Sequence, residues 1–358
     1  IFARKLNLTP SAAAPEPEPS ELLHGLSVRD LVVAGLTSNR MATVLVFLGS
    51  IWWFVDQIIS EEEQERALRG VYSRVENLMS QGTETALLAG FLLAAGIIVT
   101  SMLFSAIGSV VLFYGFRLTR RGDDLHRSYG LMTRRTSSLP RRRIQVLLIE
   151  EGLLRRLFGL AALRADTAGP RQQQGEASTG RDVLLPILPR PGVDPMLPVF
   201  FPNIETGDVE WRQVSPLAVR RGTFKGSLVC LALTGIAIPA YGLTGLLVLA
   251  LLPLIYLINL MEYRNLGYAL GEDYFRTRRG WFNRSTHVVP IRNTQAVLVH
   301  RNPFDRRLGL ATLQVDTAGQ AFTGGGPRIA NLPLGEALAL ARVLSQRATL
   351  KRYRWQSK

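Results

Sequence analysis

The chain is poor in the residues from which most catalytic and metal centres are built. It has one cysteine and four scattered histidines among 358 residues. The cysteine, Cys230, lies inside an apolar run, so the sequence contains neither a disulfide framework nor a thiolate metal site. No His, Cys, Asp or Glu residues cluster at the spacing of metal ligands. The sequence therefore predicts neither a metal site nor another cofactor.

Acidic residues are scarce relative to basic ones. Asp and Glu number 28 against 42 Lys and Arg, which gives a formal net charge of +14. Such a charge requires an acidic partner or surface, either nucleic acid or an anionic membrane leaflet. Hydrophobic residues make up 47% of the chain and gather in a few long blocks, which favours the leaflet. The basic segments also lack the interleaved aromatic residues of nucleic-acid-binding surfaces, so no nucleic-acid partner is expected.

The apolar blocks are long enough to cross a bilayer, which needs about 20 residues per helix. Residues 41–116 predict a first transmembrane helix pair, joined by an acidic connector at residues 61–84. Residues 224–262 are interrupted at Pro239 and predict a second pair of short spans with a tight turn. One long helix kinked at Pro239 is the alternative.

The segment before the first block divides into two parts. Residues 1–20 contain a Pro/Glu-rich linker, and we expect the first residues to be the tail of a missing upstream repeat. Residues 21–40 predict a juxtamembrane amphipathic helix, with Ser27 as its N-cap and Asp30 at the third helical position. Its place just before an apolar block suggests that it lies along the membrane surface.

One stretch of the chain occurs twice. Residues 130–169 align without a gap to residues 280–319, at an offset of 150 (130 to 280 and 169 to 319). Such self-similarity indicates two copies of one structural unit. The repeat signature, which we interpret as structural, consists of Gly130, Pro140, Gln145, Gly159, Asp166 and Gly169 in the first copy and of Gly280, Pro290, Gln295, Gly309, Asp316 and Gly319 in the second.

Each copy has the pattern of a small β-rich domain. Short apolar runs at residues 146–149 and 297–299 predict strands, and residues 160–166 and 310–316 alternate like half-buried strands. The apolar helix predicted at residues 333–348 closes the second unit. Several short antiparallel strands followed by one helix predict a domain with a helix over its open end.

The order of these motifs carries a family resemblance. A Pro followed five residues later by Gln, then Gly-Leu-Ala and Asp-Thr-Ala-Gly, each copy preceded by a hydrophobic pair, resembles the bacterial pleckstrin-homology-like (bacterial PH) family of YdbS/YdbT type, also called membrane-flanking domain proteins. The resemblance covers residues 20–350. It implies an α+β multi-pass membrane protein, in which each transmembrane helix pair precedes a pleckstrin-homology-like split β-barrel capped by a C-terminal helix. It implies no enzymatic activity.

The resemblance and the charges together predict domains and orientation. The two pleckstrin-homology-like domains are expected at residues 117–215 and 263–350. Lys and Arg residues flank the spans on the side that holds the repeats, and such residues accumulate in cytoplasmic flanks. We therefore expect a multi-pass protein of the bacterial cytoplasmic (inner) membrane, with both repeats on the cytoplasmic side.

The repeated Asp-Thr-Ala-Gly invites comparison with the paired Asp-Thr-Gly loops of aspartic proteases. Those loops bring two carboxylates close enough to share a proton. Here an extra Ala interrupts the loop, and each Asp, Asp166 and Asp316, ends a strand of its own autonomous unit. A strand-end turn in which Asp accepts backbone amides is therefore favoured.

The basic clusters are the most informative polar feature. Arg141–Arg143 follows Pro140 in a predicted loop, where guanidinium groups can fork onto phosphate, but the second copy keeps only Arg292 there. Positive-inside bias on a solvated face explains the clusters, which include Arg155 and Arg156, equally well. The candidate contacts for lipid or a partner are Arg141, Arg142, Arg143, Arg134, Arg135, Arg292 and Arg306.

These features together predict a non-enzymatic membrane protein. Its repeated domains would act as a binding or scaffold platform at the bilayer, through self-association as a homo-oligomer, another membrane protein, or anionic phospholipid headgroups. The alternative is a transporter, or an accessory subunit of an export or envelope-stress system, in which the transmembrane helices carry the function. That alternative depends on Asp56 and Glu262, which stand at predicted span ends.

Overall fold

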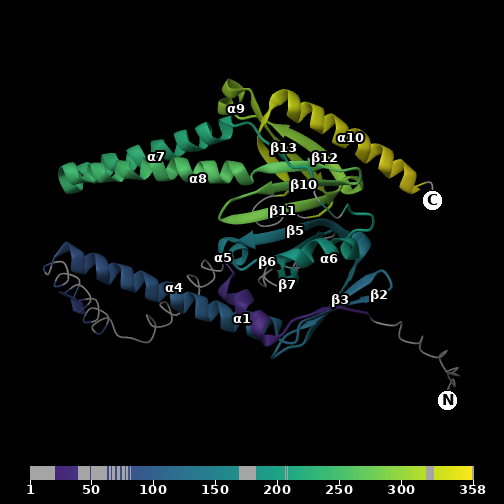
Figure 1. The fold of residues 1–358 in the computed structure, drawn as a ribbon, viewed down its shortest axis with the longest axis horizontal. Helices are drawn as coiled ribbons and strands as arrows, with labels where there is room; N and C mark the ends of the chain where they lie inside the picture. Colours follow the sequence, from purple (N-terminus) through teal and green to yellow (C-terminus); the bar gives the residue numbers. More distant parts are fainter. Residues whose placement is uncertain are drawn as a thin grey trace, which may run out of the picture.

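The computed structural model describes residues 21–38, 82–168, 183–205, 207, 209–319 and 326–356, with isolated positions between 49 and 80. The linker at residues 1–20, the predicted span at 41–59 with Asp56, and most of the connector at 61–84 lie outside the described residues. Figure 1 shows two β-rich units, from which long helices project in the same direction. We call this end of each unit the proximal end and the opposite end the distal end.

The first unit contains two sheets and two short helices. Its first sheet has the order β1-β2-β3-β4, with strands β1 (Glu21–Gly25), β2 (Arg117–Arg121), β3 (Asp124–Tyr129) and β4 (Arg135–Pro140). A 3-10 turn, η1 (Arg141–Arg143), leads into its second set of elements. These are β5 (Ile144–Gly152), α5 (Leu153–Leu157), β6 (Leu160–Thr167), β7 (Val183–Pro189), the 3-10 turn η2 (Arg190–Gly192) and α6 (Val193–Phe200).

The second unit repeats this order of elements. It begins with β8 (Arg212–Gln213), and after two long helices continues with β9 (Gly267–Leu270), β10 (Tyr274–Arg279), β11 (Asn283–Pro290) and the 3-10 turn η4 (Ile291–Asn293). Then follow β12 (Thr294–His300), α9 (Pro303–Leu308), β13 (Leu310–Thr317), β14 (Arg328–Pro333) and the closing helix α10 (Leu334–Gln356). The helix predicted at residues 333–348 is thus present and longer.

The two units share a sheet. Strands β5 and β11 pair antiparallel, which produces a seven-stranded sheet in the order β7-β6-β5-β11-β10-β9-β8. A separate three-stranded sheet, β12-β13-β14, completes the second unit. The interpretation of the copies as autonomous units is therefore wrong. The offset of the repeat predicted two similar units but not the edge at which they join.

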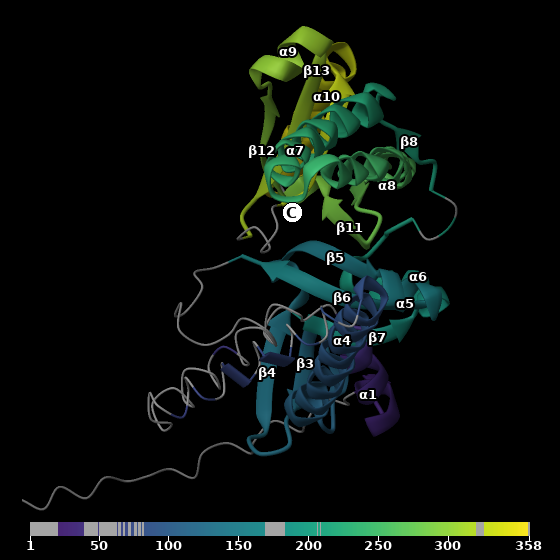
Figure 2. The same cartoon turned by 90° about the vertical axis from the view of Figure 1, so that its left-hand side faces the viewer.

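The shared sheet is buried on both faces. Leu147 and Ile149 of β5 face the core that also contains Leu118 and Leu125 of the first sheet. The alternate residues Val146 and Leu148 face the second core, beneath α10. Because successive side chains of a strand point to opposite faces, an apolar run with no polar alternation is what a doubly covered strand requires. Figure 2 shows the resulting layers from the side.

The segment predicted as a juxtamembrane helix is partly a strand. Residues Glu21–Gly25 form β1, which pairs with β2, and the helix α1 spans only Val28–Leu36. The predicted cap is confirmed, because the Ser27 side chain accepts the Asp30 amide and the Asp30 carboxylate accepts the Ser27 amide. The helix does not lie free along a membrane surface. It packs on α4 (Thr83–Phe113), with Leu31 and Ala34 buried.

Three helices among the described residues are long and apolar enough to cross a membrane. They are Leu88–Phe113 within α4, Leu217–Pro239 within α7 (Leu217–Tyr241), and Gly242–Asn265, which comprises the 3-10 segment η3 (Gly242–Leu251) and α8 (Leu252–Asn265). After residue 224 the chain forms two packed helices and not one kinked helix, because α7 packs against η3 and α8 as a hairpin. Gly242 makes the turn with φ 61°.

Candidate functional site

The proximal end of the first unit is held to α4 by its β3–β4 loop. The backbone N–H of Gly130 donates to the Tyr114 carbonyl at 2.9 Å, and that of Leu131 donates to the Val111 carbonyl at 3.2 Å. Gly130 has φ 121°, and a Cβ there would lie 2.2 Å from the Thr133 carbonyl oxygen, so the loop requires glycine. Gly280 stands in the same strained position of the second unit, with φ 82°.

The basic triplet Arg141–Arg143 lies at the distal end. Strand β4 begins at the proximal end and runs away from α4, and the triplet follows its last residue. There the Arg141 N–H donates to the Asp123 carbonyl at 3.2 Å, and its guanidinium lies 3.7 Å from the Asp123 carboxylate. Arg292 occupies the corresponding turn, η4. Arg141–Arg143 were predicted to contact lipid. Because they lie at the end of the unit away from α4, they are poor candidates for contact with a leaflet on the side of α4.

The other predicted basic residues lie at the proximal end but do not form one cluster. Arg134 and Arg135 are exposed at the start of β4, in the first sheet. Arg306 belongs to α9 of the second unit, which lies beside the start of α7. There Arg221 of α7 forms an ion pair with the buried Asp305 at 2.5 Å. The structure therefore divides the predicted set among both ends and both units.

The Asp-Thr-Ala-Gly motifs meet where the units join. Ala168 forms an isolated antiparallel bridge with Gly319, and Asp166 is buried close to Gly319. Asp316, by contrast, is exposed and accepts the Thr317 N–H at 3.1 Å. Asp316 accepts a backbone amide as predicted, but it lies within β13 and pairs with Ala296 rather than standing in a turn. Since the two carboxylates have unlike surroundings, they do not form the symmetric pair of an aspartic protease.

The remaining signature residues have structural roles or lie outside the described residues. Gly159 and Gly309 follow α5 and α9 with φ 63° and φ 66°, as helix exits require. Gln145 is buried, whereas its counterpart Gln295 is exposed. Pro140 and Pro290 precede the two 3-10 turns. Gly169 lies outside the described residues.

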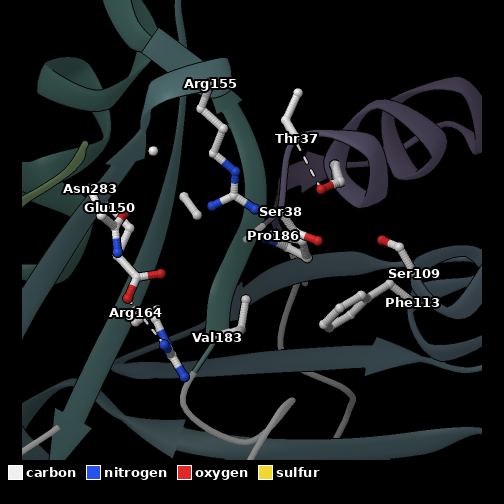
Figure 3. A pocket seen from close by; sticks show the side chains of 13 residues that line it. Thr37, Ser38, Ser109, Phe113, Glu150, Arg155, Arg164, Val183, Pro186 and Asn283 are labelled. Atoms are coloured by element: carbon white, nitrogen blue, oxygen red, sulfur yellow. Dashed lines mark hydrogen bonds and ion pairs between the residues drawn. The ribbon is translucent and has the colours of Figure 1, made fainter. Parts of the chain in front are cut away.

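A polar cavity of about 310 Å³ opens at the proximal end of the first unit. Its walls come from helices α1, α4 and α5, from strands β5, β6 and β7, and from the first residue of β11. Figure 3 shows the Arg155 side chain extending into the space between the Glu150–Arg164 ion pair and the two helices. That pair is 3.1 Å long and neutralises itself. Arg155 is the third charged side chain that lines the cavity.

Hydroxyl groups line the opposite wall, and the Asn283 amide lies beside Glu150 (Figure 3). Thr37 and Ser38 come from the end of α1, Ser109 from α4, and Asn283 from β11. Ser38 shares a 2.7 Å hydrogen bond with Ser105, which also donates to the Gly35 carbonyl at 2.8 Å. This network fixes the end of α1 against α4. Thr37 and Ser38 donate their hydroxyl hydrogens to the Val33 and Gly35 carbonyls, which leaves Ser109 and the Asn283 amide as donors toward the cavity. Together with a guanidinium, such donors can hold a phosphate or carboxylate group.

An apolar groove of about 200 Å³ adjoins this cavity and shares Thr37, Ser38 and Gly152 with it. Its other walls are largely apolar: Leu36, Ile98, Met102, Leu153, Leu154 and Phe282, with Ser101 and Ser105. Ile98 and Met102 belong to the candidate span of α4, so the groove continues from the polar cavity toward the apolar helix surface. A charged chamber beside an apolar groove suits an amphiphilic ligand.

Exposed apolar side chains surround the same end. Leu157 and Phe158 at the end of α5 are 74% and 69% exposed, next to Arg155 and Arg156. Phe304 of α9 is 60% exposed, beside Arg306 and Arg307. Apolar tips interleaved with arginines are typical of surfaces that enter the headgroup layer. Arg155 stood in a basic cluster of the sequence, whereas Arg164, Ser109 and Asn283 carried no signal because they come from distant segments.

The structure thus describes a membrane protein in which two joined β-rich units stand at the ends of apolar helices. Among the residues that the structure describes, no group of three His, Cys, Asp or Glu side chains could hold a metal ion. A family model described as "Bacterial PH domain" matches residues 71–195 and 219–348. These segments cover more than half of the chain, so the chain belongs to the bacterial PH domain family. The predicted resemblance is confirmed.

A curated relative supports the same assignment. The UPF0699 transmembrane protein YdbT of Bacillus subtilis (strain 168) is 23% identical over 211 residues, which are 59% of this chain and 42% of that protein. The chain therefore spans less than half the length of this relative. No known catalytic activity is attached to this family. No solved structure matches the chain.

Proposed function

We propose that this chain is a non-enzymatic platform in the bacterial cytoplasmic membrane, whose bacterial PH domain units bind anionic phospholipid. The observation that carries the proposal is the polar cavity at Arg155, which continues into the apolar groove along α4. A headgroup phosphate would occupy the polar part, and an acyl chain would lie beside Ile98 and Met102. Both parts of one lipid thereby find matching chemistry.

The cavity has a direct route to the bilayer. Its helical wall, α4, is itself a candidate span, so a lipid can enter sideways from the leaflet without leaving its apolar surroundings. The guanidinium of Arg155 would fork onto the phosphate, while Ser109 and Asn283 supply further donors. A single basic residue near an anionic surface contributes about 1 kcal/mol, so binding should be selective but reversible.

The proposed topology follows from the charges at the helix ends. Arg220, Arg221 and Lys225 of α7 and Arg264 of α8 stand at the proximal ends of these helices. The positive-inside bias then assigns the units to the cytoplasm, with the span expected at residues 41–59 as a fourth crossing. We further propose that each unit is a pleckstrin-homology-like split β-barrel closed by its last helix. Self-association or a membrane partner would use the remaining surface.

The test uses the full chain purified in detergent with lipids of defined composition. Phosphatidylglycerol and phosphatidylcholine retained per protein are measured by mass spectrometry for the wild type, for Arg155→Gln and for the distal control Arg142→Gln. We expect Arg155→Gln to bind phosphatidylglycerol about fivefold more weakly, as the loss of about 1 kcal/mol implies. The control should be unchanged.

Equal retention in the wild type and in Arg155→Gln would refute the proposed site. Loss of phosphatidylglycerol retention in Arg142→Gln alone would show that the lipid binds at Arg141–Arg143 at the distal end. A Met102→Trp variant tests the apolar groove separately from the polar cavity. Filling the groove should reduce retention of long-chain lipid and leave retention of a short-chain phosphatidylglycerol nearly unaffected.

A further inference from the structure

The junction between the units shows how this fold accepts an extra strand. In the β5–β11 pairing Glu151 lies opposite Arg284, and Glu150 lies opposite Ser285. Glu151 is 96% buried and forms ion pairs with Arg190 at 3.1 Å and with Arg284 at 3.8 Å. An acidic strand end thus meets a basic strand start. Cross-strand charge pairs of this kind help to set the register.

The repeat predicts a second edge of the same kind. Moving β4 (Arg135–Pro140) by the offset of 150 gives residues 285–290, which lie in β11. The same operation places β5 on β12 (Thr294–His300). In the sheets described here, β11 and β5 have partners on both sides, whereas β4 and β12 are end strands with one neighbour each. Strand β4 therefore presents the edge that β11 uses at the junction.

The backbone groups of this edge point outward in a definite alternation. The Arg141 N–H donates to the Asp123 carbonyl, so hydrogen-bonded and non-bonded pairs alternate from there along the β3–β4 ladder. Thr136 and Ser138 fall at non-bonded positions and direct their N–H and carbonyl groups away from β3. Both residues are exposed. Such an edge is a template for strand addition.

Charge repulsion disfavours a second copy of this chain as the source of a strand that pairs with β4. If β12 of another copy paired with β4 in the register of the internal junction, Arg301 would stand where Glu151 stands and His300 where Glu150 stands. They would face Arg134 and Arg135, and like charges directly opposite destabilise a strand pair. The two end strands of this chain are thus mismatched with each other.

We propose that the β4 edge accepts, as an antiparallel strand, an extended segment of a partner protein that carries two consecutive acidic residues. In the register of the internal junction these carboxylates would lie opposite Arg134 and Arg135. Within the described part of the chain neither arginine forms an ion pair, and both are exposed. The partner segment would resemble β5, which ends in Glu150-Glu151-Gly152.

The experiment uses the full chain in detergent and a fluorescent peptide with the sequence of β5, IQVLLIEEG, followed by anisotropy. A matched peptide, IQVLLIKKG, reverses the two charges. We expect the acidic peptide to bind about tenfold more tightly than the basic one. The double substitution Arg134→Glu and Arg135→Glu should reverse this preference, whereas Arg142→Glu and Arg143→Glu at the distal turn should preserve it.

Two further outcomes would overturn the proposal. A Thr136→Pro variant removes an outward N–H without touching the β3 ladder, so unchanged peptide binding would show that strand addition does not occur at β4. Dimerisation of the wild type by sedimentation, abolished by Arg134→Glu with Arg135→Glu, would identify a second copy as the occupant. Equal binding of both peptides to the wild type would show that Arg134 and Arg135 do not select acidic residues.

Discussion

At the scale of single residues, His287 is the most unusual titratable group. It lies in β11 of the shared sheet and is 1% exposed. Burial, together with the charges of Arg279 and Arg328, lowers its pKa from 6.5 to about 3. Its imidazole is therefore neutral in the folded protein at pH values where an unfolded chain would already be protonated.

His287 should make folding stability depend on pH. The unfolded state binds a proton below pH 6.5 and the folded state only near pH 3, so its contribution is complete above pH 6.5 and is lost as the pH falls toward 3. The slope for one proton is at most about 1.4 kcal/mol per pH unit. The free energy of unfolding, obtained from thermal unfolding in detergent, should depend less on pH in His287→Gln than in the wild type. The exposed control His300→Gln should keep the wild-type slope, and an unchanged slope in both would contradict the argument.

At the scale of elements, the contact of α1 with α4 depends on a glycine. A Cβ on Gly35 would lie 2.4 Å from the Ala106 Cα and 2.6 Å from the Ser105 carbonyl oxygen. Backbone atoms cannot move aside as a flexible side chain can. Any larger residue at Gly35 must therefore separate the two helices and open the wall of the Arg155 cavity.

We expect Gly35→Val to destabilise the protein by about 1–3 kcal/mol, the usual cost of overpacking a close contact. Retention of phosphatidylglycerol should fall at the same time, because Thr37 and Ser38 follow this contact. Gly108→Ala is the matched control on α4, since a Cβ there meets nothing within 4 Å. A Gly35→Val protein as stable as the control would show that the helices do not pack this closely.

At the scale of the whole molecule, the shared sheet binds the two units into one folding unit. Residues Ile144–Ile149 of β5 are buried, partly by β11 and its neighbours. A fragment limited to residues 117–215 would expose this apolar edge, and would also lack β1 and α1. Exposed apolar edge strands pair with other chains.

The isolated fragment of residues 117–215 should therefore self-associate. Sedimentation velocity at increasing concentration should show oligomers, while the full chain in detergent should keep one sedimentation coefficient over the same range. A monomeric, cooperatively unfolding fragment would mean that the units are independent after all. In that case the fragment could be used for binding studies. We expect instead that the exposed β5 strand would bind other chains and distort such measurements.

The local pattern of the chain determined much of this architecture. Residues 310–316 alternate because β13 has one core face, and the capping box at Ser27 and Asp30 is set by neighbouring residues alone. Residues 160–166, predicted as half-buried, are instead buried along most of β6, because the shared sheet is covered on both faces. The length of the apolar block after residue 224 favoured a turn near Pro239 over one kinked helix, and the structure turns at Gly242. The signature motifs sufficed to assign the family.

Tertiary structure alone decided how these elements meet. The placement of β1 beside β2, and of β5 beside β11, depends on backbone edges that every strand shares, so no side-chain pattern identifies the partner. Arg141–Arg143 resembled a lipid-binding loop, yet the direction of β4 carries it to the distal end. The Arg155 cavity joins residues from Thr37 to Asn283 that only folding brings together. Sequence periodicity reports which face of an element is covered, whereas the identity of the covering element is a property of the whole chain.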